Sequence, residues 1–142
     1  MDLRTRFGSR FFPSPIFTAS GCAGSGRELA QFIPLSELGA VVTKSIALKP
    51  RSGRATPRMA ETPSGMLNSI GLQGPGVEAF IAHDLAWLAE QGVRTVVSIA
   101  GTNVADYARL ARRLSQEAAV AGLEVNISCP NVESRGEVFA CD

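Results

Sequence analysis

The chain has 142 residues, of which 45% are hydrophobic and 19% are charged, and its formal net charge is +1. That length can bury the core of one domain, and so small a net charge argues against a surface for nucleic acid or membrane headgroups. No apolar run approaches the ~20 residues of a membrane-spanning helix, and the polar start at Met1–Arg6 lacks a signal-peptide core. We therefore expect a protein with no nucleic-acid or membrane partner.

The cysteines, Cys22, Cys129 and Cys141, are odd in number and show no Cys-x-x-Cys spacing. This pattern argues against a disulfide framework, a zinc site or an iron–sulfur cluster held by this chain alone. We expect no bound metal, and a reducing cytoplasm is the natural compartment for free thiols.

Short apolar runs alternate along the chain with segments of helical periodicity. In chain order we expect a hairpin over 3–12, a strand over 15–21, a short helix over 28–32, a strand over 39–45, a helix over 76–91, a strand over 95–101, a helix over 104–118 and a strand over 123–127. Strands that alternate with helices indicate βαβ units, whose strands are parallel and whose crossovers are right-handed. The fold class is therefore α/β.

Apolar side chains mark one face of each long helix. On the first helix they are Val77, Phe80, Ile81, Leu85 and Leu88. On the second helix they are Val104, Tyr107, Ala111, Leu114 and Ala118. Gly92 can end the first helix, and Asn103 can cap the second, with Asp106 as the third residue after the cap. Each helix should therefore pack one face on the sheet.

The segment 46–75, between the second strand and its helix, is rich in Pro, Gly, Arg and Ser. It is too long for an ordinary βα loop, so we expect it to carry function or to form a small hairpin. Its Arg51–Arg58 stretch is typical of a solvated loop or a partner contact rather than a phosphate site. We expect His83 to be solvated and Cys22 to be a small buried residue.

Small and polar residues gather where the predicted strands end. The segments are Ala19-Ser20-Gly21, Lys44-Ser45, Ser98–Gly101 and Asn126–Asn131. In parallel α/β folds ligands bind at the carboxyl ends of the strands, so these segments should meet on one rim. In the last segment Cys129 lies between two carboxamides, which can orient a planar polar ligand beside a thiol that transfers a proton. This pattern favours a small-molecule site over a structural protein.

Five motifs, in this order and spacing, carry a family resemblance. They are Ala19-Ser20-Gly21, Thr43-Lys44-Ser45, Asn68-Ser69-Ile70-Gly71-Leu72, Ser98-Ile99-Ala100-Gly101 and Asn126-Ile127-Ser128-Cys129-Pro130-Asn131. The chain resembles the amino-terminal half of a class 1 dihydroorotate dehydrogenase. The resemblance implies the amino-terminal half of a (β/α)8 TIM barrel, with a long loop or hairpin insertion after the second strand. It also implies FMN as the cofactor and oxidation of dihydroorotate to orotate in de novo pyrimidine (UMP) biosynthesis.

The same resemblance implies a subclass and partners. Asn68–Leu72, followed by Gln73-Gly74-Pro75-Gly76, is most similar to the 1B subclass. In that subclass the catalytic subunit pairs with an electron-transfer subunit that carries FAD and an iron–sulfur cluster, and electrons reach NAD. We also expect a homo-oligomer, because the open edges of a partial sheet favour association.

The resemblance assigns roles to individual residues. Cys129 is the expected catalytic base, which removes a proton from a carbon next to a carbonyl. The expected substrate-binding residues are Lys44, Asn68, Ser69, Ile70, Gly71, Leu72, Asn126 and Asn131. The expected FMN-binding residues are Ala19, Ser20, Gly21, Lys44, Ser45, Ser98 and Asn126. Without the resemblance, an inert buried thiol, a surface lysine and an ordinary turn are the common interpretations of Cys129, Lys44 and Asn68-Ser69.

Lys44 also carries an expectation of its own. It follows Val41-Val42-Thr43, a β-branched run in a sheet that should be covered on both faces. An ammonium at the end of a buried strand is costly without a counter-ion. We therefore expect Lys44 to have an anionic partner.

The predicted strands are half of those in a TIM barrel, so residues 1–142 are expected to form a single partial FMN-binding domain of about four βα units. We expect an enzyme that is active only when the missing half of the barrel completes it, and an isolated chain that is inactive. The alternatives are a non-catalytic half-barrel that self-associates and a related FMN-dependent pyrimidine-base reductase. The quinone-linked class 2 enzymes, with a serine base, fit the cysteine loop less well.

Overall fold

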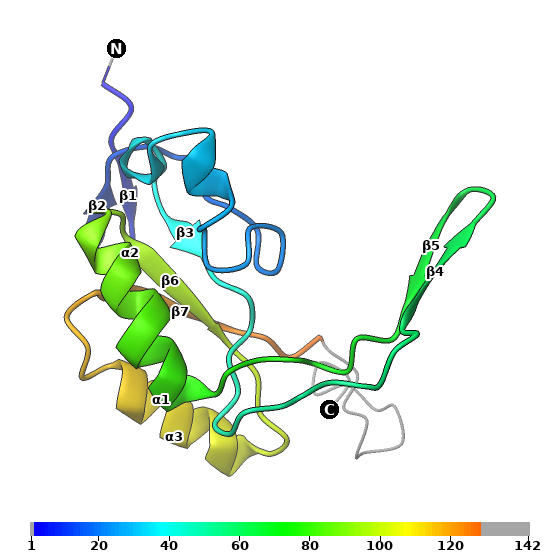
Figure 1. Ribbon diagram of the computed structural model, residues 1–142. Helices are drawn as coiled ribbons and strands as arrows, with labels where there is room; N and C mark the ends of the chain where they lie inside the picture. The colour runs from blue at the N-terminus through cyan, green and yellow to red at the C-terminus, as the bar shows by residue number, and fades with distance from the viewer. Residues whose placement is uncertain (1, 129–142) are drawn as a thin grey trace.

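The computed structural model describes residues 2–128, and its centre is a parallel sheet of three strands (Figure 1). The strands are β3 (Val41–Val42), β6 (Thr95–Ile99) and β7 (Val120–Val125), in the order β3–β6–β7. Both pairs are parallel, with a register shift between Thr95 and Val96 where β6 meets β7. Parallel neighbours that are joined through helices make this a mixed α/β fold, as the alternating sequence pattern predicts.

Two helical segments connect these strands. The first is continuous through α1 (Val77–Ala79), a π-helical stretch η3 (Phe80–Leu85) and α2 (Ala86–Glu90). The second is α3 (Val104–Leu114), in which the side chain of the capping residue Asn103 accepts a hydrogen bond from the Asp106 N–H at 2.9 Å. The first helix and the cap of the second therefore lie where the sequence predicts them. Among residues 2–128, no helix is both long and apolar enough to cross a bilayer.

Both helical segments pack on one face of the sheet through apolar side chains. The buried cluster consists of Ile46, Val77, Phe80, Leu85, Val97, Ile99, Leu110, Leu114 and Val120. Burying one such large side chain contributes about 1.5–3 kcal/mol. Val97 and Ile99 of β6 belong to this cluster, so the alternate residue Ser98 turns to the opposite face of the strand. The core thus determines which face of β6 is left for a site.

The strand predicted over 15–21 does not form, and this expectation is wrong. Its pairing among the described residues is an isolated parallel bridge between Phe17 and Ala40, beside β3. The Thr18 hydroxyl accepts a hydrogen bond from the Val42 N–H at 2.8 Å and donates one to the Val42 carbonyl at 3.2 Å. A side chain therefore satisfies backbone groups that a strand ladder would otherwise use.

Several element boundaries also differ from the sequence expectation. The helix expected over 28–32 is a short 3-10 turn, η1 (Leu29–Gln31), and a second turn, η2 (Leu35–Glu37), follows it. β7 begins and ends earlier than the range 123–127, and β3 is only two residues long. On α3, Val104 is 76% exposed and Leu110 is buried, because the first turn of the helix lies outside the apolar cluster that Leu110 enters.

The start of the chain forms the predicted hairpin. β1 (Thr5–Phe7) and β2 (Arg10–Phe12) pair in antiparallel fashion. Phe12 is buried, and the centroid of its ring lies 4.9 Å from that of Phe17. The hairpin is therefore anchored on the segment that runs beside β3.

Residues 50–75, called the arm below, leave the body of the fold and return to it (Figure 1). At the tip, β4 (Met59–Thr62) and β5 (Gly65–Asn68) form an antiparallel hairpin in which every residue is exposed. At the base, the backbones of Arg51 and Gly74 exchange two hydrogen bonds of 2.9 and 3.0 Å. Figure 1 shows the hairpin projecting away from the sheet and its helices.

Candidate functional site

Three of the predicted site residues meet where the parallel strands end. The hydroxyl oxygens of Ser45 and Ser98 are 2.9 Å apart, and either of them can be the donor. The side-chain amide of Asn126 donates to the Ser45 hydroxyl, also at 2.9 Å. Ser45 follows β3, Ser98 lies in β6 and Asn126 follows β7, so the carboxyl ends of all three strands contribute. We call these three residues the polar cluster.

Backbone hydrogen bonds hold the chain segments that carry the polar cluster. The Ile46 N–H donates to the Ser98 carbonyl at 2.8 Å, and the Ala100 N–H donates to the Ile46 carbonyl at 3.0 Å. Ser98 itself is fully buried, and its N–H donates to the Thr43 hydroxyl at 3.3 Å. Because Ser98 turns away from the helices, the polar cluster lies on the face of the sheet opposite to them.

Asn126 is fixed through all of its polar groups. Its N–H donates to the Ile99 carbonyl at 3.0 Å, and its carbonyl accepts from the Tyr107 hydroxyl at 2.7 Å. Its side-chain oxygen accepts from the Ser128 N–H at 3.2 Å and from the Ser128 hydroxyl at 3.1 Å. Its side-chain nitrogen has one hydrogen beyond the one given to Ser45. This second hydrogen has no acceptor among residues 2–128, so the described chain leaves one preoriented amide donor at this end of the sheet.

The loop between β6 and α3 is held by Asp106. Its carboxylate accepts from the Thr102 N–H at 3.1 Å and from the Thr102 hydroxyl at 2.7 Å. The hydroxyl of Thr102 is the main cause of a lowered pKa at Asp106. A side chain at Gly101 would place its Cβ 2.8 Å from the Cβ of Asp106, so only glycine allows this close approach. The loop beside Ser98 is therefore tied to the start of α3.

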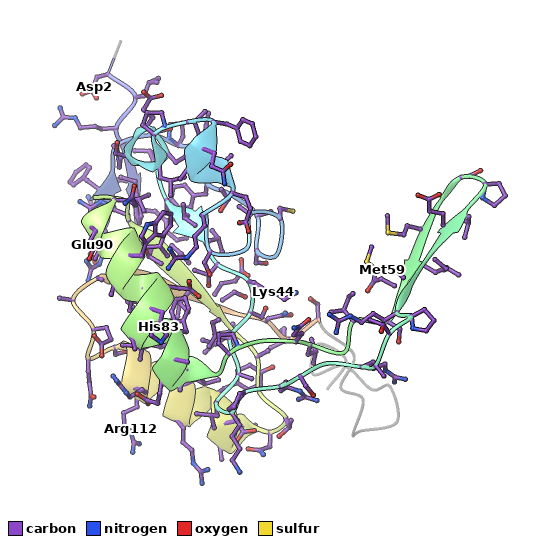
Figure 2. The ribbon with its side chains drawn as sticks, in the orientation of Figure 1. Asp2, Lys44, Met59, His83, Glu90 and Arg112 are labelled. Atoms are coloured by element: carbon purple, nitrogen blue, oxygen red, sulfur yellow. The ribbon has the colours of Figure 1, made fainter. Side chains whose placement is uncertain are left out.

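Lys44 differs from its expectation. Its anionic partner stays a prediction, because no ion pair of Lys44 is found among residues 2–128. The residue is exposed, so the predicted buried strand end is wrong. The reason is that β3 ends at Val42 and the Lys44 N–H turns to the Gly24 carbonyl, at 2.9 Å. Figure 2 labels Lys44 on the segment between β3 and the arm.

The segment Ala19-Ser20-Gly21 is exposed, and it forms a turn closed by the Cys22 N–H and the Ala19 carbonyl at 3.1 Å. Gly21 has a φ of +82°, and among residues 2–128 nothing lies within 4 Å of a Cβ placed on it. The described part of the chain therefore leaves the backbone at Gly21 open. Cys22 is an exposed free cysteine, so the expectation of a small buried residue is wrong, because the turn directs it out of the core.

Asn68 to Leu72 lie on the returning strand of the arm, next to Arg54 and Arg58. The Ser69 N–H donates to the Arg58 carbonyl at 2.8 Å, and the Arg54 N–H donates to the Ile70 carbonyl at 2.9 Å. Gly71 has a φ of +79°, and a Cβ on it would lie 2.9 Å from the Arg54 nitrogen. Leu72 also has a positive φ, of 55°. Backbone hydrogen bonds and positive φ angles therefore fix the backbone of this segment, although Asn68 and Ser69 are exposed.

The structure does not join the arm to the polar cluster directly. Among residues 2–128, no hydrogen bond links Asn68–Leu72 to Ser45, Ser98 or Asn126. Cys129, the predicted base, and Asn131, a predicted substrate contact, lie outside the described residues. Their roles stay predictions.

Sequence patterns missed several residues that build this site. The sequence predicts only a helix-face position for Tyr107, yet the Tyr107 hydroxyl donates to the Asn126 carbonyl. The available signal is a tyrosine on an apolar face, because a partly buried phenol needs a hydrogen-bond partner. The sequence predicts a solvated loop around Arg58, yet the Arg58 guanidinium donates to the Gln73 side chain at 2.6 Å and to the Arg54 carbonyl at 3.2 Å. No spacing in the sequence predicts that contact. His83 is exposed, as expected.

A hollow lies at the other end of the sheet. It has a volume of about 600 Å³, and Arg10, Phe12 and Arg94 are among the residues that line it. Arg94 directly precedes β6, so this hollow is at the amino ends of the strands. Ligands of parallel α/β folds bind at the carboxyl ends, and the polar cluster is therefore the better candidate site.

The family described as Dihydroorotate dehydrogenase matches residues 2–140 of the chain. Three curated relatives, each named "Dihydroorotate dehydrogenase B (NAD(+)), catalytic subunit", are similar over most of it. The protein of Pelobacter propionicus is 53% identical over 129 residues, which are 91% of this chain and 42% of the relative. That of Anoxybacillus flavithermus is 52% identical over 89% of this chain and 40% of the relative. That of Geotalea daltonii is 43% identical over 99% of this chain and 46% of the relative.

The chain spans less than half the length of these curated relatives. The family match nevertheless covers nearly all of the chain, including every described residue. The residues of the polar cluster lie in the motifs that carry the sequence resemblance. The chain therefore belongs to the dihydroorotate dehydrogenase family.

Proposed function

We propose that this chain is the amino-terminal part of the catalytic subunit of a dihydroorotate dehydrogenase, which oxidises dihydroorotate to orotate in de novo pyrimidine (UMP) biosynthesis. The observation that carries the proposal is the polar cluster of Ser45, Ser98 and Asn126, built at the carboxyl ends of three parallel strands. Family membership gives the reaction class, and the polar cluster gives the place in this chain where a planar polar ligand would bind.

The proposed architecture is the first half of a (β/α)8 barrel, with residues 1–142 as a single partial domain and residues 46–75 as an insertion. The order β3–β6–β7 supports it, because consecutive strands of such a barrel are parallel neighbours. The isolated parallel bridge of Phe17 to Ala40 supports it too, because a first barrel strand would lie on this side of β3. Catalysis would require the remaining strands, which the longer relatives have the length to supply.

FMN is the proposed cofactor, and the residues at the strand ends fit it. The edge of an isoalloxazine ring presents both acceptors and donors. The Asn126 amide offers a donor, and the hydroxyls of Ser45 and Ser98 can donate or accept. The open backbone at Gly21 leaves room for a ring to approach. The residues that would hold FMN are Ala19, Ser20, Gly21, Lys44, Ser45, Ser98 and Asn126. When bound, FMN supplies the acceptor for a hydride.

The proposed substrate residues would surround the carbon that loses its proton. Lys44 would bring an ammonium to the carboxylate of orotate, for which its exposed position is suitable. Asn68, Ser69, Ile70, Gly71 and Leu72 would offer carboxamide and backbone groups from the arm, and Asn126 and Asn131 would add carboxamides. Cys129 would accept the proton as a thiolate, which its surroundings or the turnover itself would have to favour over the thiol.

The proposed partners follow the names of the relatives, which are catalytic subunits of an NAD(+)-linked enzyme. We propose that a separate electron-transfer subunit with FAD and an iron–sulfur cluster takes up the electrons. We also propose that the catalytic subunit is a homo-oligomer. The fully exposed hairpin of the arm offers a surface that either association could cover.

The proposal is tested with the full-length protein that contains this chain, purified with FMN and mixed anaerobically with dihydroorotate. We expect Cys129→Ala to slow bleaching of the flavin by about 10²–10⁴-fold, the usual contribution of a positioned base, while orotate still binds. Cys22→Ala is the matched control, because Cys22 is exposed and lies outside the polar cluster. Parent-like bleaching in the Cys129 variant would contradict the assignment. Reoxidation of reduced flavin by uracil or thymine, seen as a return of flavin absorbance, and not by orotate, would favour a pyrimidine-base reductase.

A further inference from the structure

Arg27 makes three contacts with the π-helical region of the first helix. Its Nε lies 3.2 Å from the Asp84 carboxylate, and its Nη2 donates to the His83 carbonyl at 3.3 Å. Its Cζ lies 4.5 Å from the centroid of the Trp87 ring. His83 and Asp84 belong to η3, and Trp87 follows in α2. The helix thus presents an acidic group, a carbonyl and an aromatic face to one guanidinium (Figure 2 labels His83).

These contacts fix the end of the loop that carries the predicted flavin turn. The loop runs from Ala19 to Gly26, directly before Arg27. Gly26 is buried with a φ of +88°, and a Cβ on it would lie 3.1 Å from Leu35, so its backbone is pressed on the core. Its N–H donates to the Ala23 carbonyl at 2.6 Å, and its carbonyl accepts from the Ala30 N–H at 2.9 Å. The loop is therefore held at its carboxyl end by Gly26 and Arg27.

The same loop holds Lys44. The Gly24 carbonyl accepts the Lys44 N–H at 2.9 Å, and this bond turns the chain away from β3 immediately before Ser45. Gly24 is separated from Arg27 by only two residues. A displacement of the loop at Arg27 would therefore move the hydrogen-bond acceptor of Lys44. Through the backbone, it would also change the direction of the Lys44 side chain.

We propose that Arg27 is a positioning residue, which clamps the loop of residues 19–26 to the first helix and thereby sets Lys44 and the flavin turn for ligand binding. The part that concerns FMN rests on the proposed function. The side chain of Arg27 is 47% exposed and that of Asp84 is 25% exposed, so their ion pair alone contributes little. The stacking of Arg27 on Trp87 and its hydrogen bond to the His83 carbonyl add to the stabilisation from the ion pair. Lysine lacks the planar guanidinium that makes all three contacts at once.

The experiment uses the full-length protein and measures amide exchange at Lys44 without FMN, and then the dissociation constant for FMN. We expect Arg27→Ala to speed exchange at Lys44 and to weaken FMN binding about tenfold each, as the loss of these contacts implies. Asp84→Asn keeps the shape of the partner and should give a smaller effect in the same direction. Arg27→Lys should recover only part of the loss. Arg112→Ala, an exposed arginine on α3, is the control and should change neither quantity.

Exchange at Val97 in the middle of β6 separates positioning from global stability. We expect it to stay within about twofold of the parent in all variants, because a local opening leaves the core protected. Unchanged exchange at Lys44 in both Arg27→Ala and Asp84→Asn would overturn the proposal, and so would an equal acceleration at Val97. If the parent protein binds no FMN, the proposed function fails, while the exchange measurement still decides the role of Arg27.

Discussion

Different interactions hold the body of the fold, which is the sheet with its helices, and the arm. In the body, the side chains of Phe80, Val97 and Leu110 are fully buried. Its site residues bond to one another through side chains, as Ser45, Ser98 and Asn126 do. In the arm, every residue of β4 and β5 is exposed, and backbone hydrogen bonds and glycines set its path. The body therefore presents a preorganised group of side chains, whereas the arm presents a shaped backbone.

This difference indicates how each half of the proposed site would bind. A two-stranded hairpin without a core is only marginally stable in water. Met59, Met66 and Leu67 of the hairpin stay more than half exposed within the described chain. The arm should therefore depend on a ligand or a partner for its order, and the polar cluster should depend on the core. Separate changes in the two regions can test this division.

The largest effect is expected from Phe80→Ala in the body. Phe80 is fully buried between the first helix and the sheet, and truncation of such a side chain costs about 3–5 kcal/mol. Urea unfolding of the full-length protein measures this loss. Phe32→Ala is the matched control, because Phe32 is 83% exposed and should change the free energy of unfolding little. Equal losses of unfolding free energy in the two variants would contradict the view that the buried core, and not the surface, stabilises the body.

A smaller and local effect is expected from Gly71→Ala in the arm. The positive φ of Gly71 and the 2.9 Å approach to the Arg54 nitrogen exclude a side chain there, at a cost of about 1–2 kcal/mol. We expect orotate to bind about tenfold more weakly, while the free energy of unfolding of the body stays the same. Calorimetric titration with orotate and urea unfolding measure the two quantities.

Gly74→Ala is the control for this change. Gly74 lies in the same arm, its φ is not positive and nothing lies within 4 Å of its Cβ position. The Gly74→Ala variant should bind orotate as the parent does. A Gly71→Ala variant that lost stability throughout the body would show that the arm and the body fold as one unit, contrary to the comparison.

The smallest effect is a dependence of stability on pH that belongs to the loop beside Ser98. The hydroxyl of Thr102 lowers the pKa of Asp106 below its ordinary value of 3.8. A carboxyl with a lowered folded-state pKa contributes stability above its unfolded pKa, and that stability is lost as the pH falls through the folded pKa. Unfolding curves of the parent and of Asp106→Asn should therefore differ at pH 6 and converge toward pH 2. Constant separation between them would contradict this assignment.

Those parts of the fold that rest on strong periodicity could be predicted from the sequence. The apolar spacing of Val77, Phe80 and Leu85 gives the first helix, and the β-branched run at 95–99 gives β6. Asn103 was identified as a cap because its side chain and the helix start are adjacent in the sequence. The polar cluster could be anticipated as well, since strand ends in a parallel sheet converge on one rim.

Other features depend on contacts between distant residues, which local patterns do not contain. The segment 15–21 looks like a strand, but the Thr18 hydroxyl, 24 residues from Val42, takes the backbone groups of that residue. Lys44 looks buried because valines precede it, but the Gly24 carbonyl draws the chain out of the sheet. The clamp on Arg27 joins residues 57 positions apart. Each of these contacts is a consequence of tertiary packing rather than of propensity.

The two hydroxyls of Ser45 and Ser98 have a consequence for a ligand that changes its chemistry while bound. Asn126 already donates to Ser45, so whichever serine donates to the other, one hydroxyl hydrogen of the pair has no acceptor among residues 2–128. Rotation about the two C–O bonds changes which of the two oxygens carries this available hydrogen, with every heavy atom in place. A ring atom that meets the partly exposed Ser45 hydroxyl, and that is an acceptor before electron transfer and a donor afterwards, can thus be matched in both states without movement of the heavy atoms.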